Sequence, residues 1–282
     1  QAFSQLLSLL AQPFLPKLIK SASLFYFMLW LYLVLAYALG TGVFSILLRA
    51  FLKREKDFVS FSIAFQLIAA LLTLPFVFLG PSYSLEANAI IVLLASSLLW
   101  GLITLISFKS HQLIEVSLRT SISKTSVFWS LLFALLLLSE NITPNKIIGV
   151  TAIFLGIAVI YLKHGLKEQA KFGVLLIVIT ALLSALVRVI DKIGLRFFST
   201  ELYLFLLFFI PGVITFFAAR KKASELKEFV SRNKKIVFTV SLLSVVSYLF
   251  FLHALRIQEA SIVVPISELT IVVTVLGGIV FL

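Results

Sequence analysis

The chain has 282 residues, of which 61% are apolar and 13% charged, and its mean hydropathy is +1.14. Soluble domains carry about 25% charged residues, and a soluble fold of this length could not bury so many apolar side chains. The composition therefore excludes a water-soluble globular protein and predicts a protein of the lipid bilayer. The net charge of +12 does not indicate nucleic-acid binding, because the basic residues lie between apolar runs.

The residue types that build redox and metal sites are scarce. The chain has no cysteine, which excludes disulfides and thiolate chemistry. Its three histidines (His111, His164 and His253) are far apart in sequence and lack the spacing of zinc ligands. We therefore expect neither a metal nor a cofactor.

Nine apolar runs follow one another along the chain, and each approaches the roughly 20 residues that a helix needs to cross the hydrocarbon core. They cover residues 24–51, 58–79, 88–108, 115–138, 144–162, 172–195, 202–219, 236–255 and 259–282. Segments of about ten residues with alternating character, which mark a membrane β-barrel, are missing from the sequence. The sequence therefore predicts an all-α polytopic membrane protein.

The first 27 residues allow two interpretations. Pro13 and Pro16 interrupt an amphipathic pattern, and Met28 is the only methionine of the chain. Residues 1–27 are therefore either an interfacial segment or a segment foreign to the native protein.

Lysine and arginine are unevenly divided between the connections of these spans. The first, third, fifth and seventh connections together hold 14 basic residues, whereas the other four hold 3. Because basic loops tend to stay in the cytoplasm, we expect the odd-numbered connections on the cytoplasmic side of the cell membrane.

The sequence contains an internal repeat at an offset of 144 residues. Residues 97–138 align without gaps with residues 241–282 and share ten identities, including Glu115 with Glu259 and Ser123 with Ser267. The repeat contains five spans, so its second copy must enter the membrane in the opposite orientation, an arrangement that recurs in transporters. We expect a first repeat at 28–162, a cytoplasmic linker at 163–171 and a second repeat at 172–282.

Two short motifs resemble a known family. The stretch from Ser139 to Gly149, with Glu140, Thr143 and a later Gly156, is similar to the junction between spans four and five in EamA-type members of the drug/metabolite transporter superfamily. Residues 253–265 resemble the start of the ninth helix in the same family. The resemblance implies ten helices in two inverted five-helix repeats, without ATP or a redox cofactor, so a tenth span is expected beyond Leu282. Ser139 replaces the usual glycine of the motif.

Charged side chains within spans are costly and usually face a cavity or the bundle interior. Lys124 and Glu268 occupy equivalent positions of the two repeats near mid-membrane, so they can pair directly or through a substrate. Arg188 and Asp191 are three residues apart on one helix, where they form either a structural ion pair or a gate. The candidate substrate-binding residues are Lys124, Glu268, Arg119, Ser123, Ser267, Arg188, Asp191, Trp100, Tyr248 and His253. Further candidates for the same cavity are Tyr32, Tyr37 and Gln66.

The sequence favours a secondary transporter that exports a small polar metabolite by alternating access around a midplane site. Basic residues outnumber acidic ones within the spans, which favours an anionic or zwitterionic, amino-acid-like solute. Proton coupling through Glu268 and a homodimer are compatible with these patterns. The alternatives are a membrane-embedded enzyme acting on lipid or prenyl substrates, for which a cluster of acid/base groups is missing from the sequence, and a non-transporting scaffold subunit.

Overall fold

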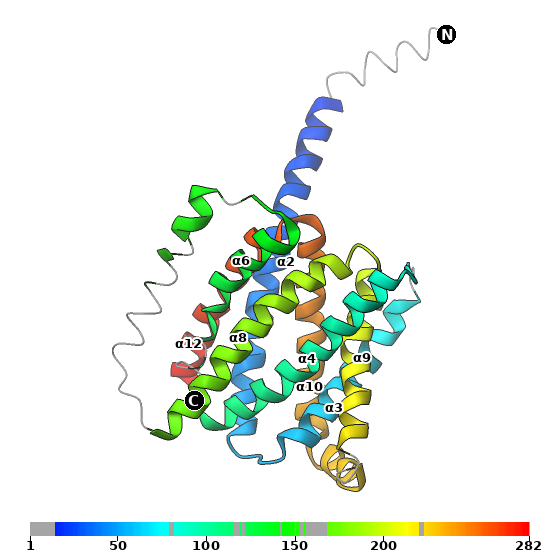
Figure 1. Ribbon diagram of the computed structural model, residues 1–282, viewed down its shortest axis with the longest axis vertical. Coiled ribbons are helices and arrows are strands. Elements are labelled where there is room, and N and C mark those ends of the chain that lie inside the picture. Colours follow the sequence, from blue (N-terminus) through cyan, green and yellow to red (C-terminus); the bar gives the residue numbers. More distant parts are fainter. Residues whose placement is uncertain are drawn as a thin grey trace.

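The computed structural model describes residues 15–78, 82–114, 119, 122–141, 143–149, 151–152, 155, 168–219 and 223–281. These residues form an all-α bundle (Figure 1). Its helices are α2 (Leu15–Leu52), α3 (Phe58–Val77), α4 (Ala87–Leu113), α6 (Ser126–Leu138), α8 (Glu168–Gly194), α9 (Thr200–Ala218), α10 (Ala223–Ile257), α11 (Ala260–Ser267) and α12 (Thr270–Phe281). Seven segments of the described chain are long and apolar enough to cross a membrane, which confirms a polytopic membrane protein.

Several helix limits differ from those predicted. Helix α2 begins at Leu15, ahead of the predicted start at residue 24, and its first turns extend beyond the bundle (Figure 1). Helix α10 begins at Ala223 instead of residue 236. The added residues, 223–235, include two Glu, three Lys and one Arg, which favour helix without being apolar, so a search for apolar runs missed them. Most of the predicted fifth span, 144–162, lies outside the described residues.

The predicted ninth span is two helices rather than one, because the chain turns at Glu268 and Leu269 between α11 and α12. The fourth span has the same break, with a turn at Lys124 and Thr125 before α6. In both places the turn is closed by a backbone hydrogen bond between residues three apart in sequence. Val127 N donates to the Lys124 carbonyl at 3.0 Å, and Ile271 N donates to the Glu268 carbonyl at 3.0 Å. The two breaks are 144 residues apart, as the internal repeat requires.

Helix packing follows the same symmetry. Helix α2 packs against α10 as α8 packs against α4, and α12 packs against α2 as α6 packs against α8 (Figure 1). Helices α3 and α9, which are equivalent to each other, pack together. Exchange of the two repeats thus maps each contact onto another, which is the pattern of a pseudo-two-fold axis.

The ends of α4 and α10 are tied down in matching ways. Arg49 of α2 donates to the carbonyl of His111, and Lys192 of α8 donates to the equivalent carbonyl of Leu255, at 2.6 Å. One residue further on, the Gln112 amide and the Arg256 guanidinium each donate to carbonyls of the connection that follows the first helix of their own repeat. Side chains of different type therefore fulfil the same role in the two repeats.

Close helix contacts use glycine, as is common in membranes. A Cβ added at Gly101 of α4 would lie 2.8 Å from Pro211 of α9, and one at Gly42 of α2 would lie 2.6 Å from Val273 of α12. These contacts hold the two repeats close together around the cavities described next.

Candidate substrate site

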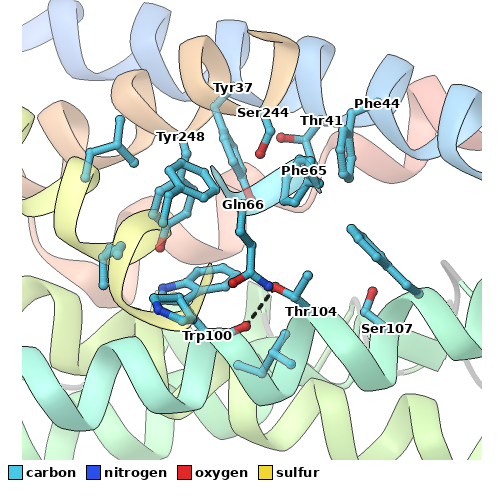
Figure 2. Close-up of a pocket in the computed structure, with 16 residues that line it drawn as sticks. Tyr37, Thr41, Phe44, Phe65, Gln66, Trp100, Thr104, Ser107, Ser244 and Tyr248 are labelled. Atoms are coloured by element: carbon cyan, nitrogen blue, oxygen red, sulfur yellow. Dashed lines mark hydrogen bonds between the residues drawn. The ribbon is translucent and has the colours of Figure 1, made fainter. Parts of the chain in front are cut away.

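Two adjoining cavities lie between the repeats. The first, which we call the aromatic cavity, has a volume of about 150 Å³ and is lined mainly by aromatic and aliphatic side chains of α2, α3, α4, α9 and α10 (Figure 2). The second, which we call the charged cavity, has a volume of about 190 Å³ and extends to the two helix breaks. The residues that line both cavities are Tyr37, Thr41, Phe44, Trp100, Ile103 and Ser107. The cavities therefore form one site with an apolar end and a polar end.

Glu268 lines the charged cavity and contacts several of its polar side chains. One of its carboxylate oxygens accepts from Lys124 Nζ, and the other accepts from Arg188 at 2.6 Å and from Ser126 Oγ at 3.3 Å. Lys124 and Glu268 are each only 6% exposed. The predicted contact between them is therefore present, whereas a role in substrate binding stays a prediction for both.

One of the two predictions for Arg188 and Asp191 was a structural ion pair between them. The structure does not show this pair, so that prediction is wrong. Arg188 turns to Glu268 instead. Asp191 is fully buried and accepts four hydrogen bonds from neutral groups: from Ser96 Oγ and from Tyr203 at 2.8 Å on one oxygen, and from Trp100 Nε1 at 3.2 Å and Tyr248 at 2.5 Å on the other. The two residues thus belong to separate networks, because side chains three apart on a helix can still reach different neighbours.

The remaining predicted residues fall into two groups. Arg119 lines the charged cavity and donates to Ser110 Oγ at 2.9 Å and to Ser107 Oγ at 2.5 Å, and Ser123 lines the same cavity. Ser267 lines neither cavity and donates to the Val264 carbonyl at 2.6 Å within α11. His253 also lies away from both cavities, 3.3 Å from Glu201.

Of the further candidates, Tyr37 and Gln66 line the aromatic cavity, whereas Tyr32 is 61% exposed and lines neither cavity. Thr104 and Ser107 were missed by the sequence interpretation. The signal was available, because polar residues at 100, 104, 107 and 111 recur at the spacing of one face of α4. That stripe runs along the cavities.

Three buried polar atoms on the cavity walls have no hydrogen-bond partner among the described residues, namely Gln66 Oε1, His111 Nδ1 and Arg188 Nε. Figure 2 shows Gln66 extending across the aromatic cavity toward Trp100 and Thr104. Buried polar atoms are nearly always paired with protein, water or ligand. These atoms are therefore available to a bound solute.

The motif around Ser139 forms a junction between the repeats. The Glu140 carboxylate accepts from the backbone N–H groups of Ala260 and Ser261, both at 2.9 Å, and so caps the start of α11. Lys146 donates to Glu259 at 2.6 Å and to Ser261 Oγ at 2.7 Å. The hydrogen bond from Lys146 lowers the pKa of the Glu259 carboxyl below its usual 4.5.

Ser139 ends α6 with a φ of 54°, in the left-handed region that favours glycine. We expect Ser139→Gly to raise the free energy of unfolding by about 1 kcal/mol, because a side chain in this conformation costs roughly 1–2 kcal/mol. Thermal unfolding in detergent would measure the change. As a control, Ser139→Ala keeps the Cβ and should give no such gain, so equal stability of the Gly and Ala variants would contradict the prediction.

This architecture is typical of membrane transporters: inverted repeats with broken helices that enclose a charged cavity at their interface. The chain belongs to the EamA-like transporter family, whose model matches residues 28–162 and 171–282. This confirms the resemblance seen in the sequence, and with it a membrane transporter of many spans.

Comparison with curated proteins and solved structures supports the fold of the chain and nothing more specific. No curated protein matches the chain. A solved structure described as "Crystal structure of protein" is similar with a TM-score of 0.54 and 14% sequence identity, covering 86% of this chain and 87% of its own. At this identity the likeness supports the arrangement of helices and says nothing of a substrate.

Proposed function

We propose that the protein is a secondary transporter of a small zwitterionic or anionic, amino-acid-like solute that binds across the two cavities. The observation that carries the proposal is the charge balance of the charged cavity, where Arg119, Lys124 and Arg188 face a single carboxylate, Glu268. Two of these cations are engaged by Glu268, whereas Arg119 is held only by serine hydroxyls among the described residues. A solute carboxylate would therefore find its counter-charge at this end.

The other end of the site supports an amine and an apolar body. Gln66 Oε1 is an acceptor without a partner among the described residues, and the rings of Tyr37, Trp100 and Tyr248 lie on the wall of the same cavity. Ammonium groups bind well to carbonyl oxygens and to aromatic faces. An amino acid with an apolar side chain has a carboxylate for the charged cavity, and an ammonium group and an apolar body for the aromatic cavity.

Counterflow in proteoliposomes tests the proposal. We expect preloaded vesicles to take up radiolabelled L-phenylalanine or L-glutamate faster than protein-free vesicles, and to take up no excess of the lipophilic cation tetraphenylphosphonium. Arg119→Gln should raise the half-saturating concentration at least tenfold, since a hydrogen bond to a charged group contributes about 1.5–3 kcal/mol. Lys109→Gln is the matched control, because Lys109 is a nearby basic residue of α4 that lines neither cavity. Uptake of the cation alone would contradict the proposal.

The proposal includes alternating access, export, and a cell-membrane location with the basic connections in the cytoplasm. The distribution of Lys and Arg supports this orientation. Because the chain has no cysteine, single cysteines at Lys56 and Glu86 can be labelled in whole cells with an impermeant maleimide. We expect labelling at residue 86 alone, and the reverse result would invert the topology.

A further inference from the structure

We propose that Asp191 is a proton-binding site whose protonation rearranges the hydrogen bonds of two cavity-lining residues, Trp100 and Tyr248, and so links proton binding to solute binding. The second half of this inference rests on the proposed transport function. The argument begins with the surroundings of the carboxylate, which differ from those of the other buried carboxylate in the core, Glu268.

Glu268 is poorly suited to gain and lose a proton. It contacts both Lys124 and Arg188, so its protonation would leave two buried cations without a counter-charge, which is very costly. Asp191 contacts no cation among the described residues, and its four donors are neutral. A proton on Asp191 therefore removes an isolated buried charge instead of creating one.

The helices around Asp191 provide few charged neighbours. On its own helix, α8, Arg188 is directed to Glu268 and Lys192 to the carbonyls of Leu255 and Gln258. The titratable groups that face Asp191 are Tyr203 from α9 and Tyr248 from α10, both through their hydroxyls.

The other packed helices add no titratable group at this point. Helix α4 contributes Ser96 and Trp100, which do not titrate, while its Lys109 and His111 lie at its far end. On α10, His253 is occupied by Glu201 and Arg256 by carbonyls of the α8–α9 connection. Helices α6 and α11 contain no titratable side chain in their described ranges. Within the described part of the chain, the charge of Asp191 is therefore balanced only by oriented dipoles.

Protonation changes what this cluster can satisfy. The ionised carboxylate accepts from all four donors, but a protonated one must donate one bond. The indole N–H of Trp100 is a donor only, so it cannot receive that bond, whereas the Tyr248 hydroxyl on the same carboxylate oxygen can. A proton on this oxygen would therefore turn Tyr248 from a donor into an acceptor and release Trp100.

Trp100 and Tyr248 also lie on the cavity side of the cluster. Both line the aromatic cavity, and their rings pack edge to face with centroids 5.0 Å apart. A change in the hydrogen bond of either residue would change the wall of the solute site. The proton itself would arrive from water through the cavity and leave the same way, and no covalent bond other than the O–H bond of Asp191 would be made or broken.

Tyr203, on the far side of the cluster, packs directly against α8. A Cβ at Gly194 would lie 2.5 Å from the Tyr203 ring, so glycine is required for this ring to approach α8. Trp100 and Tyr248, in contrast, border the open space of the aromatic cavity.

Trp100 fluorescence tests the proton site without any solute. The chain has three tryptophans, so the purified full chain with Trp30→Phe and Trp129→Phe reports on Trp100 alone. We expect its emission to change with pH between 4 and 10 in one transition that Asp191→Asn abolishes. Glu259→Gln, which removes a carboxylate outside the core, should leave the transition unchanged.

A second variant keeps the test decisive if Asp191→Asn does not fold. Tyr248→Phe removes one donor to the carboxylate and should move the midpoint to higher pH by about one unit. A pH-independent emission of Trp100, or a transition that survives Asp191→Asn or ignores Tyr248→Phe, would overturn the proton site.

The link to transport is tested in proteoliposomes with L-phenylalanine. We expect Asp191→Asn to retain counterflow at equal pH and to lose at least tenfold of the accumulation driven by a pH gradient. Unchanged gradient-driven accumulation in the variant would overturn the link. If the wild-type protein shows no counterflow of any solute, the transport proposal fails instead, and the Trp100 titration still decides whether Asp191 binds the proton.

Discussion

Glu268→Gln is expected to lower the free energy of unfolding by about 3–5 kcal/mol, because it leaves Lys124 and Arg188 as buried cations without a counter-charge. Lys124→Gln should cost clearly less, since Glu268 keeps its contact with Arg188 at 2.6 Å. The order of these two effects follows from the three-membered network, and a simple Lys–Glu pair would give similar losses. Unfolding of the purified protein in mixed detergent micelles would measure both.

A surface pair provides the control for this comparison. Arg232, with a side chain 62% exposed, contacts Glu55 at 3.1 Å, and exposed pairs contribute about 1 kcal/mol or less. Arg232→Gln should therefore change stability little. The triple change Lys124→Gln, Arg188→Gln and Glu268→Gln removes all three charges and should be more stable than the sum of the single losses implies. Additive effects would show that the three groups do not interact.

Transport should be lost in Glu268→Gln as well. The carboxylate holds both cations in place at the helix breaks, so its loss changes the positions of the groups proposed to bind the solute. Counterflow that remains at wild-type level in a folded Glu268→Gln protein would separate this network from solute binding.

The pairing of Lys124 with Glu268 could be predicted because the repeat places them at equivalent positions, and helices related by a two-fold axis can meet. The partners of Arg188 and Asp191 could not. By the offset of 144 their equivalents are Phe44 and Leu47, so the charges belong to one repeat only and symmetry gives no partner. Their contacts depend on helices distant in sequence, which helical spacing alone does not bring together.

The fold shows the same division. The lengths of the apolar runs located most helices. The same criterion predicted continuous spans at 115–138 and 259–282, where the structure has breaks at Lys124 and Glu268. Pro265, which lies inside α11, was a signal for a break in the second copy, but prolines within α3 and α9 leave those helices uninterrupted. Proline therefore does not identify a break without the tertiary structure around it.

Glu140 is expected to hold one end of the protein closed. It belongs to the first repeat and accepts two backbone hydrogen bonds from α11 of the second repeat. Nearby, the backbone of Ser84 and Ser199 bridges the α3–α4 and α8–α9 connections, with hydrogen bonds of 2.9 Å to Phe197 and 2.7 Å to Ser82. At the opposite end, the described residues include an exposed contact between the repeats, that of Glu55 with Arg232, and exposed pairs contribute about 1 kcal/mol or less. We infer that the seal at the Glu140 end is the stronger one.

Glu140→Ala removes both hydrogen bonds and the negative charge at the start of α11, where a helix favours an anion. Since one hydrogen bond to a charged group contributes about 1.5–3 kcal/mol, we expect the population open at this end to rise at least tenfold. Spin labels can be attached to cysteines placed at Asn141 and Ile257, both of which are exposed. Pulsed electron–electron double resonance would report the change as a longer distance between the two labels.

A second label pair distinguishes opening of the protein from local fraying of α11. Glu86 and Arg196 lie on the two bridged connections and are exposed, so rigid movement of one repeat against the other should lengthen this distance as well. Glu259→Gln is the matched control, because its half-exposed carboxylate pairs with Lys146 in the same junction but caps no backbone, and it should shift neither distance. Lengthening of the 141–257 distance alone would show that Glu140 stabilises only the first turn of α11, and the closed end would then depend on the backbone bridge between Ser84 and Ser199.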